Sequence, residues 1–173
     1  MRCPSCGEEN IEGMEQCEHC RADLTQLFAA SGPSPLEARL AADSVAAVKL
    51  RKPIVVGPET RVSEAVDRLC AQRFGCALVM NGDKLIGIFT ERDLLTKVMT
   101  AGASARQRPV RDFMTPDPQT VTLQDPLASA MKHMVVGEYR HLPVIDDGKV
   151  AGVLSVRDLL GYLFEVSVTG APA

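Results

Sequence analysis

The stretch GIFTERDLL at residues 87–95 returns as GVLSVRDLL at residues 152–160, 65 positions later. The same offset pairs residues of the same kind on both sides of this stretch, without a gap. Pairs in this register are Pro53 with Pro118, Val56 with Val121, Ala65 with Ala130, Phe74 with Tyr139, and Val79 with Val144. So many matches at one offset, without a gap, are not expected by chance. A solenoid needs at least three repeats, so two copies indicate one duplicated structural unit within residues 46–164.

Both copies predict the same order of elements. Apolar residues at helical spacing predict an amphipathic helix, and short apolar runs around turn residues predict a two-stranded hairpin. The expected helices lie at 62–73 and 127–136, and the expected strands at 77–80, 85–89, 142–145 and 150–154. Each hairpin ends at Thr90 or Ser155, which is expected to cap a closing helix.

The corner at the end of each hairpin carries residue types that suit a phosphorylated sugar. A helix that opens directly after a strand presents unpaired N–H groups and a positive dipole end, which stabilise an anion. Hydroxyl and guanidinium groups would donate to a phosphate, and a carboxylate would accept the hydroxyl protons of a ribose. The candidate residues are Thr90, Arg92 and Asp93 in the first copy and Ser155, Arg157 and Asp158 in the second.

A helix cap explains the same corner without any ligand. In a capping box the acidic side chain simply satisfies the backbone N–H of the capping residue. The pattern nevertheless occurs twice at one offset, each time after a glycine and two apolar strand residues. That recurrence favours ligand binding by at least one copy.

Four of the six cysteines form two C-x-x-C pairs near the amino terminus, namely Cys3 with Cys6 and Cys17 with Cys20. Two such pairs aim four thiolates at one point, the tetrahedral set that Zn²⁺ accepts. Disulfides are the alternative. The chain shows no export signal, however, and in a reducing compartment a cysteine cluster more often holds a metal than forms disulfides. A closed site of this kind is structural, and metal binding would supply the folding free energy of so short a segment. The choice between zinc and iron stays open, and Cys70 and Cys76 are expected in the core.

Composition limits the classes of partner. A chain of 173 residues with 46% hydrophobic content can bury a core, and no apolar run approaches the ~20 residues of a membrane span. We therefore expect a cytoplasmic protein with no membrane partner. The net charge is −3, Trp is absent, and aromatic residues make up 4% of the chain. Nucleic acid is an unlikely partner, because phosphate neutralisation and base stacking both lack the residues they need.

The repeated order, with the signature G-h-h-[TS]-x-x-D, resembles the CBS domain, which occurs as tandem pairs called Bateman modules. The resemblance covers residues 46–164 and includes MTP at 114–116 and LPVID at 142–146. It implies two copies packed about a pseudo-twofold axis, two clefts between them for adenosyl ligands, and a homodimer. The first copy departs from the pattern, with GCAL at 75–78 where the second has RHLP at 140–143.

The same resemblance extends the set of site residues. It places Thr115 and Thr120 in the cleft of Thr90, and Arg140 and His141 in the cleft of Ser155. The adenine would be held by backbone groups near Val55 and Thr120. For His141, a surface histidine at a strand end is an equally good interpretation.

Residues 1–24 resemble the short zinc-ribbon modules at the ends of many microbial proteins, although Arg21 stands where those modules often have glycine. The proline-rich stretch SGPSP at 31–35 and the helix-favouring run at 36–42 mark a boundary. The expected organisation is a zinc ribbon at 1–24, a linker and helix at 25–45, CBS domains at 46–108 and 109–164, and a tail at 165–173. The expected fold class is thus α/β (α+β), a tandem CBS pair preceded by a small ribbon.

These features predict a binding module and not an enzyme, because no Ser/His/Asp or Cys/His arrangement remains that the repeat does not explain. The leading hypothesis is a regulatory sensor that binds AMP, ADP, ATP or an S-adenosyl compound and acts through a partner. The alternative is a zinc-ribbon adaptor whose CBS pair serves dimerisation and docking. Residues 1–24 contain two basic and six acidic residues, so an unknown protein is a better docking partner than nucleic acid.

Overall fold

The computed structural model describes residues 2–11, 14–24 and 35–169. The chain divides into two compact units, Met1–Arg39 and Leu40–Ala173. Most of the proline-rich boundary at 31–35 and the end of the tail, 170–173, lie outside the described residues. No described helix is both long and apolar enough to cross a membrane.

The described residues up to Leu24 in the first unit form two similar knuckles. In each, the backbone N–H of a residue four positions after a cysteine donates to that cysteine's carbonyl, from Gly7 to Cys3 and from Arg21 to Cys17. Gly7 (φ 75°) and Arg21 (φ 57°) both adopt the left-handed conformation that such a turn requires. Arg21 therefore forms the same turn as Gly7 does. Because Arg21 has a side chain, this left-handed conformation is energetically unfavourable for it. Leu24 is fully buried against Cys3 and Cys17.

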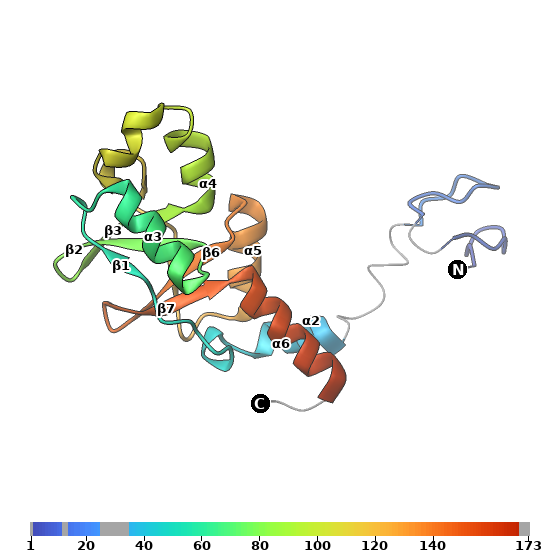
Figure 1. The fold of residues 1–173 in the computed structure, drawn as a ribbon. Helices are drawn as coiled ribbons and strands as arrows, with labels where there is room; N and C mark the ends of the chain where they lie inside the picture. The colour runs from blue at the N-terminus through green and yellow to red at the C-terminus, as the bar shows by residue number, and fades with distance from the viewer. Residues whose placement is uncertain (1, 12–13, 25–34, 170–173) are drawn as a thin grey trace. The chain divides into compact units, whose positions relative to one another are not determined.

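The second unit contains the duplicated copies (Figure 1). The unit boundary falls within helix α2 (Pro35–Ala42). The helices α3 (Val62–Gln72), α4 (Glu91–Asp93), α5 (Leu127–Gly137) and α6 (Val156–Thr169) lie in the second unit. Short irregular helices are η1 (Val45–Ala47), η2 (Leu94–Val98), η3 (Ala103–Gln107) and η4 (Val110–Asp112). The strands are β1 (Val55–Val56), β2 (Cys76–Asn81), β3 (Lys84–Thr90), β4 (Thr115–Pro116), β5 (Val121–Thr122), β6 (His141–Asp146) and β7 (Lys149–Ser155).

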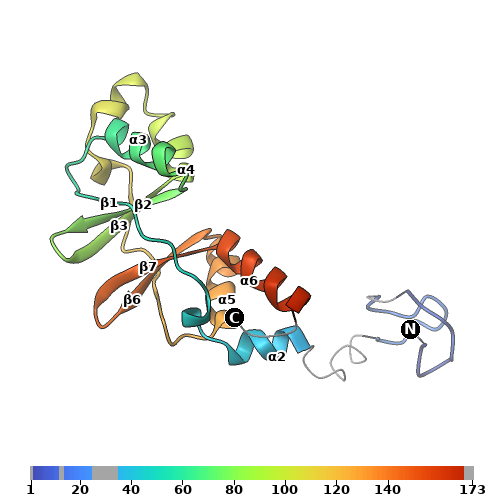
Figure 2. The same ribbon diagram turned by 60° about the horizontal axis from the view of Figure 1, so that its bottom comes forward.

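Two small sheets form the centre of this unit, which confirms the expected mixed α/β fold class. The first sheet has the order β1-β2-β3-β4, and the second has the order β5-β6-β7. In both, a short strand pairs in parallel with a hairpin of two antiparallel strands. Figure 2 shows the two hairpins next to each other, with α3 and α4 beyond the first and α5 and α6 beyond the second.

The two copies exchange their leading segments. We define these as residues 44–51, which precede the first copy's β1, and residues 109–116, which precede the second copy's β5. Ser44 bridges to Pro126 at the start of α5, and Pro109 bridges to Arg61 at the start of α3. Arg51 pairs with Val153 of β7, while β4 pairs with β3. Each leading segment therefore completes the sheet of the other copy.

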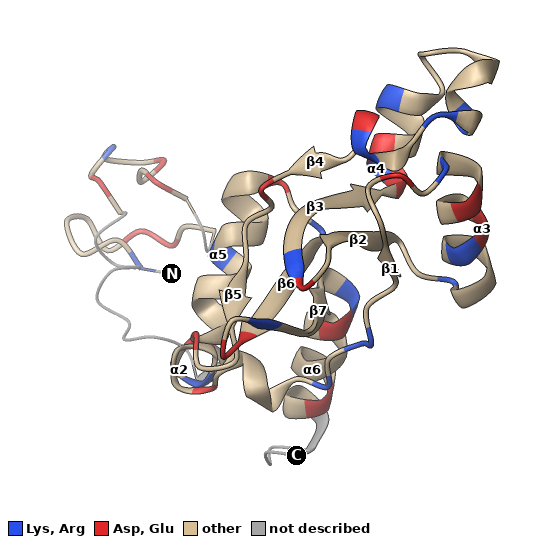
Figure 3. Cartoon of the chain, turned by 90° about the vertical axis from the view of Figure 1, so that its left-hand side faces the viewer, with Lys and Arg blue, Asp and Glu red and all other residues tan. Residues whose placement is uncertain are grey.

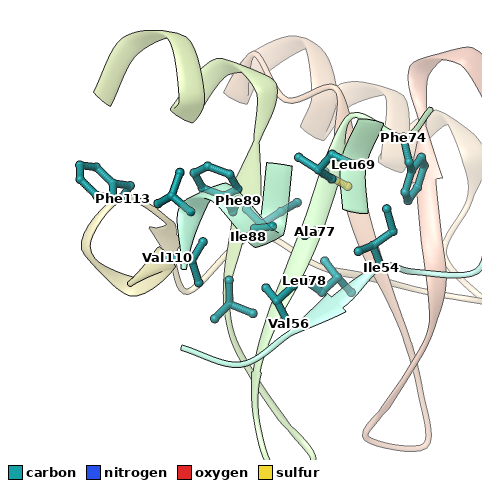
Figure 4. Close-up of a cluster of buried hydrophobic side chains, with 14 of the residues drawn as sticks. Ile54, Val56, Leu69, Phe74, Ala77, Leu78, Ile88, Phe89, Val110 and Phe113 are labelled. Carbon is teal, nitrogen blue, oxygen red and sulfur yellow. The ribbon is translucent and has the colours of Figure 1, made fainter. Parts of the chain in front are cut away.

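Each of the two hydrophobic clusters contains side chains from the leading segment of the other copy. The cluster of the first copy includes Val110 and Phe113 from the second leading segment, together with Leu78 and Phe89 of the hairpin (Figure 4). The cluster of the second copy includes Val45 and Val48 from the first leading segment. Each copy is thus incomplete without the other, because part of its core comes from the chain that leads into its neighbour.

The glycine of the repeated signature has a steric reason. A Cβ at Gly87 would lie 2.4 Å from Met114 Sδ, and a Cβ at Gly152 would lie 2.9 Å from Leu50 Cβ. Both obstructing side chains belong to a leading segment that crosses the strand. The signature therefore carries glycine where the exchanged chain passes over the sheet.

One expectation is wrong, and one closing helix has an irregular geometry although Thr90 caps it as expected. Cys76 is fully buried, and burial, with a smaller contribution from Glu91, raises its pKa to about 12, but Cys70 on α3 is exposed and is not a core thiol. The closing helix of the first copy is a single α-helical turn followed by the π-helix η2, whereas α6 is regular over 14 residues.

Candidate ligand cavities and metal centre

Thr90 and Asp93 form a closed, hydrogen-bonded corner at the end of β3. Asp93 is 4% exposed, and its Oδ2 accepts from the Thr90 backbone N–H at 2.9 Å and from the Thr90 hydroxyl at 2.7 Å. The Asp93 N–H donates back to Thr90 Oγ1 at 3.2 Å, which completes a capping box. Asp93 Oδ1 accepts from the Thr115 hydroxyl at 3.0 Å and pairs with Lys97 Nζ at 2.6 Å. Both oxygens of this carboxylate are therefore engaged.

Ser155 and Asp158 repeat this corner at the end of β7. Asp158 Oδ2 accepts from the Ser155 backbone N–H at 3.0 Å and from the Ser155 hydroxyl. The Asp158 N–H donates to Ser155 Oγ at 3.2 Å. Among the described residues, Asp158 Oδ1 accepts from one donor, Arg51 Nε, at 3.1 Å. A carboxylate oxygen accepts about two hydrogen bonds, so Asp158 can accept one more.

A cavity opens beside each corner. The Thr90 cavity has a volume of about 290 Å³ and is lined by Thr90, Arg92, Asp93 and Thr115, together with residues 116–119 and 137–139. The Ser155 cavity has a volume of about 220 Å³ and is lined by Ser155, Arg157, Arg51, Arg73 and Phe74. Both volumes lie just below the range of typical small-molecule pockets, ~300–1,000 Å³.

The structure brings most of the sequence-predicted residues to these two places. Thr115 and Thr90 line one cavity together, as expected. Asp158 lines neither cavity, but it accepts a hydrogen bond from Arg51, which lines the Ser155 cavity. Val55 and Thr120 line neither cavity. Val55 is 45% exposed, since its neighbour Val56 faces the core and successive side chains of a strand point to opposite faces. Contact of Val55 and Thr120 with adenine stays a prediction.

Arg140 and His141 line both cavities, together with Gly75 and Glu91. These four residues form a shared wall. The His141 ring packs edge-on against Phe74, with ring centroids 5.9 Å apart. A Cβ at Gly75 would lie 2.9 Å from His141 Cε1, so glycine makes room for the imidazole. Burial lowers the pKa of His141, against an opposing influence of the Glu91 and Asp158 carboxylates.

Several residues of the site carried no signal in the sequence. Arg51 lies near the start of the first copy, two residues before the first matched pair, Pro53 with Pro118. Arg73 ends α3 in a left-handed conformation. Glu138 occupies the equivalent position after α5 and pairs with Arg92 at 3.4 Å. Arg73 and Glu138 are 65 positions apart and therefore equivalent in the repeat. Because one is basic and the other acidic, the repeat alone did not indicate that each lines a cavity.

The four amino-terminal cysteines converge within the first unit. Their Sγ atoms all lie within 4.8 Å of one another. Cys3 and Cys20 Sγ are 3.6 Å apart, as are those of Cys6 and Cys17, far beyond the ~2.05 Å of a disulfide. A tetrahedron with Zn–S arms of ~2.3 Å has edges of about 3.8 Å, so the spacing fits that ion. Backbone N–H groups, first that of Cys20, lower the pKa of Cys17 to about 6, which favours the thiolate that a metal needs.

Comparison with known proteins identifies the repeated unit. The family model described as CBS domain matches residues 45–100 and 110–165. An uncharacterized 17.7 kDa protein of Acidianus ambivalens is 32% identical over 136 residues, which are 76% of this chain and 81% of the relative. The CBS domain-containing protein CBSCBSPB1 of Arabidopsis thaliana is 30% identical over 128 residues. That match covers 73% of this chain and 24% of the relative, so the chain spans about a quarter of the plant protein's length.

Solved structures agree with the assignment. The crystal structure of the CBS domain NE2398 is 35% identical, with a TM-score of 0.61, and the match covers 64% of this chain and 87% of that one. The CBS domain protein PAE2072 from Pyrobaculum aerophilum, complexed with AMP, is 26% identical, with a TM-score of 0.63. That match covers 72% of this chain and 98% of the other.

Proposed function

The chain belongs to the CBS domain family, and on that premise we propose that its repeated unit is a non-catalytic regulatory module for an adenosine-containing ligand. The ligand class is AMP, ADP, ATP or an S-adenosyl compound, bound in the Thr90 and Ser155 cavities. The observation that carries the proposal is the pair of corners. In each, a capping hydroxyl holds an aspartate next to an arginine-lined cavity. Asp93 lines the Thr90 cavity itself, and Asp158 contacts Arg51 in the lining of the Ser155 cavity.

The chemistry of the Ser155 corner suits a ribose. Asp158 is 9% exposed at its side chain, its Oδ2 is held by the cap, and its Oδ1 accepts one further hydrogen bond. A ribose hydroxyl can donate to that oxygen without breaking the cap. The cap and the ligand are therefore compatible uses of one carboxylate. The AMP complex of the Pyrobaculum aerophilum relative supports the same ligand class.

Regulation requires that the ligand favour one arrangement of the two copies. A ligand shifts such an equilibrium only by binding its two states unequally. The shared wall offers the physical link, because Arg140 and His141 face both cavities and each leading segment is packed on the opposite copy. We propose that this module works in the cytoplasm, where its thiols stay reduced.

Calorimetric titration and thermal shift test the ligand class. AMP, ADP, ATP, S-adenosylmethionine and GTP should be titrated into the wild type and into Asp93→Asn and Asp158→Asn. Asparagine keeps the cap but weakens acceptance from a ribose. The matched control is Asp125→Asn, because Asp125 accepts from the Thr122 N–H and lines neither cavity. Adenosyl-dependent stabilisation that either Asp93→Asn or Asp158→Asn loses supports the proposal. No shift at millimolar ligand contradicts it and leaves both corners as helix caps.

We propose that Cys3, Cys6, Cys17 and Cys20 hold a structural Zn²⁺. The ion would supply the folding free energy of a segment whose buried hydrophobic cluster is Cys3, Cys17 and Leu24. Elemental analysis of purified protein should give about one zinc per chain, and Cys17→Ser should lose it. Cys70→Ser, which changes an exposed thiol on α3, is the control and should retain the metal. Iron in place of zinc would contradict the choice of ion.

We further propose that a second copy of the chain covers an exposed apolar surface on the closing helices. Leu95 and Met99 of the first copy are 66% and 65% exposed, and Leu160 and Phe164 at the same offset are 60% and 70% exposed. Apolar side chains in equivalent positions suit an interface between copies. Sedimentation should show a homodimer that Leu160→Lys dissociates and Lys132→Gln does not. If the wild type is monomeric, this surface instead fits the protein partner of an adaptor.

A further inference from the structure

The two cavities differ in charge. Four arginines and one glutamate line the Ser155 cavity, whereas two arginines and four acidic residues line the Thr90 cavity. Glu91 and Arg140 belong to the shared wall and do not distinguish the two. The difference comes from Arg51, Arg73 and Arg157 on one side, and from Asp93, Asp117 and Glu138, which face Arg92, on the other. Figure 3 shows acidic and basic residues next to each other on α4, and the residues of α4 line the Thr90 cavity.

The arginines of the Ser155 cavity are largely uncompensated. Arg51 is paired with Asp158 at 3.1 Å. Within the described part of the chain, Arg73, Arg140 and Arg157 have no acidic side chain within salt-bridge distance. All three line the cavity and are exposed, so they are accessible to a phosphate chain that leaves it. Guanidinium groups bind phosphate oxygens through paired, charge-assisted hydrogen bonds.

The Thr90 cavity has the opposite balance. Arg92, the arginine that lines only this cavity, donates to the Glu138 carboxylate and to the Glu138 carbonyl, both at 3.4 Å. Lys97 is held by Asp93 at 2.6 Å. Asp117 and Glu138, which line only this cavity, are exposed and would repel each further phosphate of a nucleotide. A ligand with one phosphate or none, or with a positive charge, suits this cavity better.

We propose that the Ser155 cavity binds adenosine di- or triphosphate and that the Thr90 cavity binds an adenosyl ligand with at most one phosphate. This inference rests on the proposed function and assigns a ligand class to each of its two cavities. The module would then sense adenosine di- or triphosphate in one cavity and an adenosyl ligand with at most one phosphate in the other. The shared wall lies between the two cavities. Binding in the Ser155 cavity depends on charge, so its affinity falls steeply with added salt.

Calorimetry on the full chain with ATP and AMP tests the assignment. Wild type saturated with ATP should still bind AMP, about one per chain. The double variant Arg73→Gln and Arg157→Gln should lose at least about tenfold in ATP affinity, while AMP affinity changes less than about twofold. The control is Arg106→Gln, an exposed arginine that lines neither cavity and should leave both affinities unchanged.

A second variant tests the acidic side. Asp117→Asn with Glu138→Gln removes two negative charges, and both residues adopt the left-handed conformation, which asparagine tolerates at position 117. This variant should admit ATP to the Thr90 cavity and raise its stoichiometry toward about two per chain. Thermal unfolding without ligand checks that each variant is folded.

Three results overturn the inference. One is equal loss of ATP and AMP affinity in the double arginine variant, another is unchanged ATP affinity in it, and the third is full competition between ATP and AMP in the wild type. In all three the chain still binds adenosyl ligands, so the proposed function stands. If no adenosyl ligand binds the wild type, the proposed function fails and this assignment fails with it.

Discussion

Arg51 and Asp158 are 107 positions apart in the chain, yet Arg51 Nε donates a hydrogen bond to Asp158 Oδ1 at 3.1 Å. The contact joins the leading segment of the first copy to the signature aspartate of the second. Its counterpart in the other copy is the bond from Thr115, in the second leading segment, to Asp93 at 3.0 Å. The exchange of leading segments thus positions a donor from one copy on the candidate ligand-binding carboxylate of the other.

Arg51→Gln should destabilise the repeated unit and weaken ligand binding at the Ser155 cavity. Asp158 would keep its cap but lose the charged donor to Oδ1, at a cost of about 1 kcal/mol given the partial exposure of Arg51. Urea unfolding measures this loss. Lys52→Gln, an exposed neighbouring cation, is the control. Equal stability of the two variants would show that the ion pair contributes nothing.

Gly152→Ala should destabilise the unit more than Gly87→Ala. The new Cβ at 152 would meet Leu50 Cβ at 2.9 Å and the Arg51 carbonyl oxygen at 3.2 Å, whereas at 87 it meets the end of the flexible Met114 side chain. Overpacking of this kind costs ~1–3 kcal/mol. Gly161→Ala, in α6 with open space around it, should instead stabilise by up to ~1 kcal/mol. Thermal unfolding of the three variants gives the order, and a destabilising Gly161→Ala would contradict it.

Arg21→Gly should tighten metal binding by the first unit. Arg21 holds φ at 57°, where an L side chain costs ~1 kcal/mol, and glycine removes that cost. Under the proposed coupling of folding and metal binding, affinity should rise about fivefold. Competition with a chelator measures the change. Gly7→Ala, at φ 75°, is the converse variant and should weaken binding by a similar factor. Weaker binding by Arg21→Gly would indicate that the Arg21 side chain itself stabilises the site.

Stability of the repeated unit should fall as the solution becomes acidic, in part through His141. Burial lowers the pKa of His141 in the folded protein, whereas the unfolded chain takes up the proton at the ordinary pKa of ~6.5. The unfolded state therefore binds more protons below pH ~6.5, and stability is lost as the pH falls from there toward the folded pKa. Urea unfolding across this range should show that the free energy of unfolding depends less steeply on pH in His141→Gln than in the wild type.

The origin of that slope can be separated from charge effects. Because burial is the main cause, the difference between wild type and His141→Gln should persist in about 0.5 M NaCl, which screens Glu91, Asp158, Arg140 and Arg51. Loss of the difference in salt would assign it to those neighbours instead.

Local sequence was enough to predict the hairpins and their helices. The predicted helix at 62–73 is α3 (Val62–Gln72), and the predicted helix at 127–136 is α5 (Leu127–Gly137). Apolar spacing and turn residues act over a few positions, so they are visible in the chain itself. The closing helix after Thr90 was less predictable. The same capping pattern is followed by one α-helical turn and then a π-helix in the first copy, and by a regular helix in the second, and the pattern alone does not distinguish them.

The sequence by itself determined the duplicated α/β unit, the two corners with their aspartates, and the four-cysteine cluster, because repeats and short motifs are encoded by neighbouring residues. Only the tertiary structure decided which cavity each residue lines, that Arg51 reaches Asp158, and that Arg140 and His141 face both cavities. It also placed the exposed Cys70 and separated the basic cavity from the acidic one. Contacts between residues so far apart depend on how the two copies pack against each other, and no local pattern records that packing.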